Sequence, residues 1–259
     1  MVKVVKFGGS SLASAEQFAK VGDIIRADES RKYVVPSAPG KRNSKDTKVT
    51  DMLYACYAKA EAGEEFRVPL MKIKERYDSI INGLGLKVTL DEEFKTISKN
   101  FKEKAGADYA ASRGEYLNGI LMADYLGYEF IDSATVIFFD EEGNLDADKT
   151  DKVLAKKLSE CEKAVIPGFY GIGADGHILL YSHLQGCLPL YSVHTGHSEV
   201  QMPQYISFRI RFPFFCSSLT HCVKSAAAQQ ASCIAGSFVI IGGLRGLPQT
   251  LEQRKVEFV

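Results

Sequence analysis

Short apolar runs alternate with longer amphipathic segments along most of the chain before residue 180. Runs rich in Val, Ile and Phe, bounded by turn residues, predict strands at 2–7, 33–36, 130–138 and 164–169. Apolar positions that recur every three or four residues predict helices at 13–28, 49–62, 67–82, 91–104, 107–126 and 148–162. Strands that alternate with helices indicate an α/β fold, a three-layer α/β/α sandwich around a mostly parallel sheet.

The first predicted strand breaks into Gly8-Gly9-Ser10, directly before a predicted helix. Two glycines let the backbone approach an anion and adopt positive φ, amides at a helix start carry partial positive charge, and Lys6 adds a full charge. No Gly-Lys-Ser/Thr follows, so the turn is not a Walker A loop. The pattern is typical of a phosphate-binding turn, and an ordinary strand-to-helix turn is the alternative.

Two further segments predict a ligand site. Ser37-Ala38-Pro39-Gly40 closes the second strand at its carboxyl end, where open α/β sheets bind ligands, and the polar loop 41–48 after it is flexible enough to fold over one. Glu115 opens a helical stretch that is otherwise apolar and small, so its carboxylate is predicted either to face a ligand or to cap the helix start.

Composition excludes several classes of partner. The net charge of the 259-residue chain is +0 without a basic stripe, which argues against nucleic acid and anionic membranes. Met1 leads directly into a charged strand and no apolar run approaches the roughly 18 residues of a membrane span, so we expect a cytoplasmic protein. Six cysteines without a C-x-x-C spacing predict reduced thiols.

The character of the chain changes near residue 176. Only three of the 32 acidic residues lie beyond it, whereas all five histidines do. We considered a metal site there, made of His183, Cys187, His194 and His197. The spacing and context of this tract are unlike those of zinc sites, so no metal site is predicted.

Five segments have the order and spacing of the aspartate kinases: 6–11, 33–42, 48–53, 112–115 and 165–171. The chain therefore resembles an aspartate kinase over residues 2–178. The resemblance implies the amino-acid kinase fold and ATP-dependent phosphorylation of the L-aspartate side chain to 4-phospho-L-aspartate, the first step of lysine, threonine and methionine synthesis. It also implies Mg²⁺ that arrives with ATP and bridges the phosphates. A homo-oligomer is compatible with the chain.

The resemblance also implies roles for individual residues. Lys6 would stabilise the transferring phosphoryl group, while the backbone amides of Gly8, Gly9 and Ser10 would hold phosphates. The substrate would contact Ser37, Thr50, Glu115 and Phe169, with Glu115 binding its α-amino group. Without the resemblance, Ser37 and Thr50 are more typical of turn or cap residues than of a binding site, and the alternative for Lys6 is a surface lysine on a strand edge.

Residues 179–259 depart from the family. The expected Phe-Ser-Arg-Gly-Gly-Ser-Asp loop, the adenosine-binding segment and the ACT modules are not recognisable there. A shifted reading frame is one account, since 184–188 can be written CTC CAG GGG TGC CTC, which one base later encodes Ser-Arg-Gly-Ala-Ser. A divergent second half is the other. We therefore predict a kinase lobe at 1–178 and a divergent or frameshifted tail at 179–259, with a catalytically inactive fragment that binds only substrate or a partner subunit as the alternative function.

Overall fold

The computed structural model describes residues 2–181 and 255–258, and its strands form two sheets. The larger sheet is five-stranded and parallel, in the order β3-β4-β2-β1-β7. Its strands are β1 (Lys3–Phe7), β2 (Arg31–Pro36), β3 (Glu129–Phe130), β4 (Ala164–Val165) and β7 (Lys255–Phe258). A separate antiparallel pair joins β5 (Tyr170–Ile172) and β6 (Ile178–Leu180). The rest of the predicted tail lies outside the described residues.

Every predicted helix is present, with ends that differ by a few residues. The helices are α1 (Ala15–Arg26), α2 (Val49–Glu61), α3 (Arg67–Leu84), α4 (Asp91–Lys102), α5 (Ala107–Leu126) and α6 (Ala147–Ser159). Gly85 and Gly127 end α3 and α5 at φ 67° and 70°, a left-handed conformation that glycine adopts without strain. Among the described residues no helix is both long and apolar enough to cross a bilayer.

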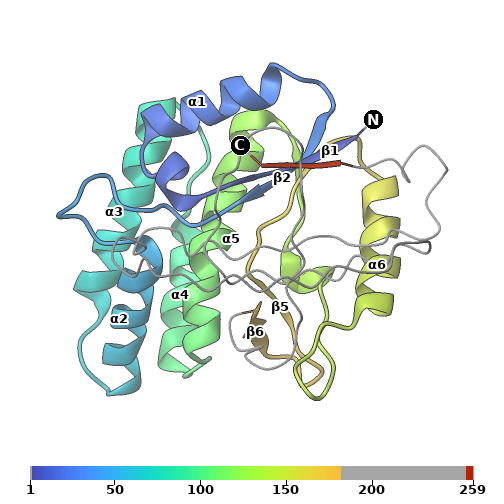
Figure 1. Ribbon diagram of the computed structural model, residues 1–259. Coiled ribbons are helices and arrows are strands. Elements are labelled where there is room, and N and C mark those ends of the chain that lie inside the picture. The colour runs from blue at the N-terminus through green and yellow to red at the C-terminus, as the bar shows by residue number, and fades with distance from the viewer. Residues whose placement is uncertain (1, 182–254, 259) are drawn as a thin grey trace, which may run out of the picture.

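Side chains of the central strands alternate between two apolar cores. Val34 and Val165 join the core formed with α1 to α5, whereas Tyr33 and Ala164 join a second core that includes Leu154 of α6. Figure 1 accordingly shows α2, α3, α4 and α5 grouped together and α6 on the opposite side of the molecule. The predicted three-layer α/β/α arrangement is confirmed, because one sheet presents a buried face to each group.

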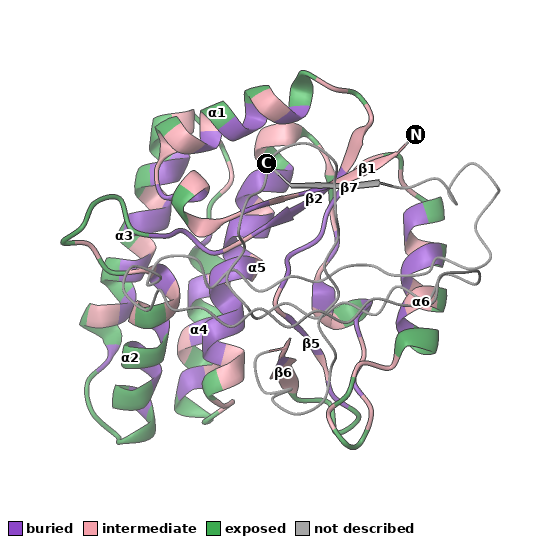
Figure 2. Ribbon diagram, viewed as in Figure 1, coloured by how far each residue is buried: buried purple, intermediate pink, exposed green. Residues whose placement is uncertain are grey.

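Helix α5 is the centre of the larger core. It contacts β2, β3 and β4 on one side and α2, α3 and α4 on the other. Figure 2 shows α5 mostly buried, whereas the outer surfaces of α2 and α4 are exposed. A helix buried on nearly all sides places any polar residue that it carries inside the protein, which matters for Glu115.

The predicted strand at 130–138 is wrong. Strand β3 ends at Phe130, and a 3₁₀ turn follows at Ser133–Thr135. The Asp132 carboxylate accepts a hydrogen bond from the Ala134 amide at 3.0 Å, and the Ser133 hydroxyl donates to the Pro167 carbonyl. The Asp132 bond is local and the Ser133 bond reaches the loop after β4, and both tie this segment into a turn where a strand ladder was expected, which apolar patterning alone does not reveal.

Candidate active site

The turns that follow β1 and β2 interlock at the carboxyl edge of the sheet. The Ser37 amide donates to the Phe7 carbonyl at 3.1 Å, and the Gly40 amide donates to the Gly9 carbonyl at 2.8 Å. A Cβ on Gly9 would lie 2.7 Å from the Ala38 oxygen, closer than real contacts allow. Glycine is therefore required at position 9 for the close approach of the two turns.

The predicted conformation of the glycine turn is wrong in two respects. Gly8 has φ −75°, and neither Gly8 nor Gly9 is among the described glycines with positive φ. A short 3₁₀ helix at Gly9–Leu12 follows the turn, and α1 begins later, behind the Ser14 cap. Any amides offered to a phosphate thus belong to the 3₁₀ turn, where Ser10 is exposed, and not to the start of α1.

Glu115 lies in the middle of α5, so the prediction that it opens a helix is wrong, and with it the alternative of a cap. Its Oε1 accepts a hydrogen bond from the Ala38 amide at 3.2 Å. The residue is only 8% exposed, and its Oε2 is buried without a hydrogen-bond partner in the part of the chain that the structure describes. Burial raises the pKa of the Glu115 carboxyl to about 7, against the opposing effects of the Ala38 bond and of nearby cations.

Lys6, the penultimate residue of β1, is a cation that interacts electrostatically with this carboxylate. Burial lowers the pKa of the Lys6 ammonium to about 8, while the charge of Glu115 acts in the opposite direction. The Lys6 charge in turn lowers the pKa of Glu115. The two groups therefore stabilise each other's charged forms, and the edge of the sheet offers one cation and one anion that interact electrostatically.

The structure also brings Ser37 and Thr50 to this edge. Ser37 lies in the turn that Glu115 contacts, and its carbonyl accepts a hydrogen bond at 2.6 Å from Asn118 of α5. Thr50, the second residue of α2, has its hydroxyl oxygen 3.7 Å from the position that a Cβ on Gly114 would occupy. The Ser37 turn and the first turn of α2 thus both lie against α5.

Phe169 is placed differently. It has φ 78°, a conformation uncommon for a residue with a side chain, and its ring packs against the small cluster of Ala111, Tyr170 and Leu180. Its carbonyl accepts a hydrogen bond from the Tyr181 amide at 3.0 Å. The packing of Phe169 on a substrate stays a prediction. Backbone strain of this kind is concentrated at functional sites.

Three buried residues that support the turns were missed in the sequence. Arg76 of α3 donates to the Gly40 carbonyl and to the Asp46 carboxylate, both at 2.8 Å, so the loop 41–48 is anchored at both ends. Tyr77 donates to the carbonyl of Gly114 at 2.8 Å, and Asn118 holds the Ser37 turn. Of these three residues, only Asn118 could have been found from the sequence, because it lies one helical turn after Glu115 and therefore on the same face of the helix.

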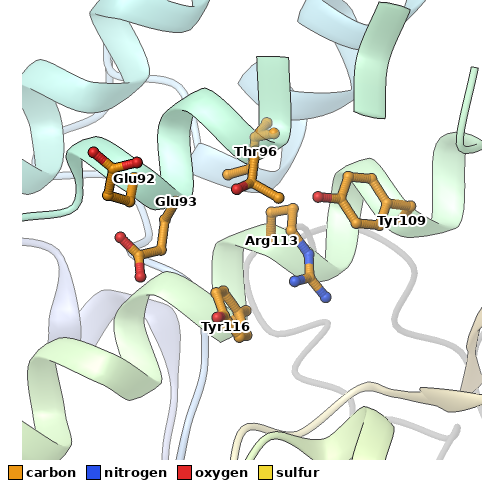
Figure 3. Close-up of a pocket in the computed structure, with 7 residues that line it drawn as sticks. Glu92, Glu93, Thr96, Tyr109, Arg113 and Tyr116 are labelled. Atoms are coloured by element: carbon orange, nitrogen blue, oxygen red, sulfur yellow. The ribbon is translucent and has the colours of Figure 1, made fainter. Parts of the chain in front are cut away.

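A cavity of about 120 Å³ lies between α4 and α5, apart from these turns. Its lining residues are Glu92, Glu93, Thr96, Ile97, Tyr109, Arg113 and Tyr116 (Figure 3). The Arg113 guanidinium lies over the rings of Tyr109 and Tyr116, 4.7 and 4.4 Å from their centres. Arg113 and Glu115 project from the helix about 200° apart, so the cavity occupies another face of α5 than the candidate site.

Within the described ranges, no group of three or more His, Cys, Asp or Glu side chains could hold a metal ion. The four His and Cys residues considered in the sequence, between 183 and 197, lie outside those ranges.

Comparison with known proteins identifies relatives of the described region. The sequence profile of the amino acid kinase family matches residues 1–184. Aspartokinase 3 of Bacillus subtilis (strain 168) is 35% identical over 195 residues, 70% of this chain and 43% of that protein. The crystal structure of aspartate kinase from Clostridium acetobutylicum is 48% identical with a TM-score of 0.68, covering 70% of this chain and 42% of that one.

A more distant structure shares the fold. Aspartokinase III of E. coli, solved in complex with aspartate and ADP, is 22% identical with a TM-score of 0.58 over 70% of this chain and 43% of that one. The chain thus spans less than half the length of the relatives that it matches.

Proposed function

The chain belongs to the amino acid kinase family, and on that basis we propose that it binds L-aspartate and ATP for phosphoryl transfer to the aspartate side chain. A side-chain carboxylate oxygen attacks the γ-phosphorus, the bond from that phosphorus to the β–γ bridging oxygen breaks, and ADP leaves. The product, 4-phospho-L-aspartate, would enter lysine, threonine and methionine synthesis. The observation that carries the proposal is the meeting of Lys6, the interlocked turns and buried Glu115 at one edge of the sheet.

The charges of this edge suit the reaction. Transfer between two anions needs positive charge near the phosphoryl group, and the Lys6 ammonium can supply it beside the glycine turn. The α-ammonium of aspartate needs an anionic acceptor, and Glu115 offers a carboxylate oxygen that no described residue satisfies. Mg²⁺ would arrive with ATP and bridge its phosphates.

A catalytically inactive fragment that binds substrate or a partner subunit is the second candidate. Two observations favour this candidate. The match covers only 43% of the Bacillus subtilis relative, and residues 179–259 lack the arginine loop and the adenosine-binding segment of the family. Because those segments hold the substrate carboxylate and the nucleotide in the family, we expect the chain as written to have little or no turnover.

The test is aspartate-dependent ADP formation by the chain as written and by a version whose tail is restored from the shifted reading frame. We expect turnover only from the restored chain. In that chain, Lys6→Ala should lower kcat by a factor on the order of 10² to 10⁴ with little change in aspartate affinity. A folded restored chain without aspartate-dependent ADP formation would contradict the proposed function, and comparable turnover from both chains would contradict the account of the tail.

A further inference from the structure

One peptide group of the second turn is held at both of its ends by α5. The Ser37 carbonyl accepts a hydrogen bond from Asn118 Nδ2 at 2.6 Å, and the amide of the same peptide, that of Ala38, donates to Glu115 Oε1 at 3.2 Å. Glu115 and Asn118 are three residues apart and so share one face of the helix. Their side chains together fix the orientation of the 37–38 peptide.

Each of these side chains also has an oxygen that no other described residue contacts by a hydrogen bond. Glu115 Oε2 and Asn118 Oδ1 are the two side-chain oxygens of the described residues that are buried without a hydrogen-bond partner. The amide orientation of Asn118 is fixed by chemistry, because only its Nδ2 can donate to the Ser37 carbonyl. The orphan atom is therefore an acceptor and not a donor.

Two buried acceptors on one helix face favour the binding of a ligand that can donate several hydrogen bonds to them. Leaving such atoms unsatisfied costs stability, and an adjacent carboxylate favours a donor that carries positive charge. A primary ammonium has three N–H groups in a tetrahedral arrangement and can donate to both oxygens at once. A hydroxyl has one donor, and a carboxylate has none.

We propose that Asn118 is a specificity-determining residue: its Oδ1 accepts a hydrogen bond from the substrate α-ammonium beside Glu115, while its Nδ2 holds the turn. This inference rests on the proposed function and adds a residue that the sequence motifs do not contain. It makes a substrate's amino group a condition for tight binding, because a ligand without that group leaves both oxygens unsatisfied.

The experiment compares L-aspartate with succinate, which lacks only the amino group. Dissociation constants of both ligands are measured by saturation-transfer NMR on the full 259-residue chain and on Asn118→Ala. We expect Asn118→Ala to weaken aspartate binding about tenfold and succinate binding by less than about twofold. A merely structural role would weaken both ligands by the same factor, and that result would overturn the inference.

Two further variants separate structural loosening from a lost acceptor. Tyr77→Phe removes a buried hydrogen bond to the Gly114 carbonyl on the same helix but leaves both acceptors, so it should change the two affinities equally. Asn118→Asp keeps an acceptor and loses the donor to Ser37, so it should retain the preference for aspartate even if Asn118→Ala does not fold. Loss of the preference in folded Asn118→Asp would contradict the proposal.

The outcome also distinguishes this inference from the proposed function. If the parent chain prefers aspartate, Glu115→Gln removes that preference and Asn118→Ala preserves it, the proposed function stands and the role of Asn118 is wrong. If the parent chain binds neither ligand, or binds both equally, the proposed function fails and the inference fails with it.

Discussion

Replacement of Glu115 by glutamine should reverse a pH-dependent loss of stability. Burial raises the pKa of this carboxyl from 4.5 to about 7 in the folded chain. Between these pH values the folded protein keeps a proton that the unfolded chain releases, so the free energy of unfolding falls as pH rises. A difference of roughly 2.5 pKa units corresponds to a loss of about 3 kcal/mol in the free energy of unfolding. The loss begins above pH 4.5 and is complete above pH 7. Glutamine cannot ionise and keeps an oxygen for the Ala38 amide.

Urea unfolding at pH values from 4 to 8, followed by far-UV circular dichroism, measures the effect. Relative to the parent, Glu115→Gln should gain about 3 kcal/mol between pH 4.5 and pH 8. Glu75→Gln, at an exposed position of α3, is the matched control and should follow the parent at every pH. Parallel curves for Glu115→Gln and the parent would show that the carboxyl ionises normally in the folded protein, and the reasoning from burial would then be wrong.

Three further predictions concern the surroundings of this carboxylate. Lys6→Met removes a cation that lowers the pKa of Glu115, so the pKa of Glu115 should rise above about 7 in a ¹³C NMR titration. An unchanged pKa would show that Lys6 and Glu115 do not interact electrostatically. Gly9→Ala should cost about 1 to 3 kcal/mol in urea unfolding, because its Cβ would meet backbone atoms, whereas Gly8→Ala should be close to neutral since nothing lies within 4 Å of its Cβ. Arg76→Met should release the loop that it anchors and speed tryptic cleavage there; an unchanged cleavage rate would contradict the anchor.

The fold was predictable where periodicity and local signals agreed. Helices α1 to α6 follow from apolar spacing, and glycines mark the ends of α3 and α5. The strand at 130–138 failed because Asp132 and Ser133 form side-chain bonds that take the place of a ladder. The prediction that Glu115 opens a helix failed because α5 begins at Ala107, as the helix predicted at 107–126 requires, and this places Glu115 in the middle of the helix.

The candidate site was predictable only where its residues are contiguous in sequence. Lys6, the glycine turn and the Ser37 turn stand at strand ends, and the topology of a parallel sheet brings such ends together. The supporting bonds of Arg76 and Asn118 connect residues 36 and 81 positions apart along the chain. No local pattern encodes those contacts, because they depend on how α3 and α5 pack against the turns.

The packing of α5 keeps Glu115 buried, with one carboxylate oxygen that no described residue satisfies. A Cβ on Gly114 would lie 2.8 Å from the Ala38 Cβ, and one on Gly119 would lie 2.7 Å from Pro167, so the helix is held close on both sides of the acceptor pair. The Glu115 carboxylate is buried in this packing, and a donor that enters beside it would give its Oε2 a hydrogen-bond partner that the described residues do not supply. We accordingly expect L-aspartate to raise the urea midpoint more at pH 8, where Glu115 is ionised, than at pH 5, where it is protonated. Equal increases at the two pH values would mean that the ligand does not bind through this carboxylate.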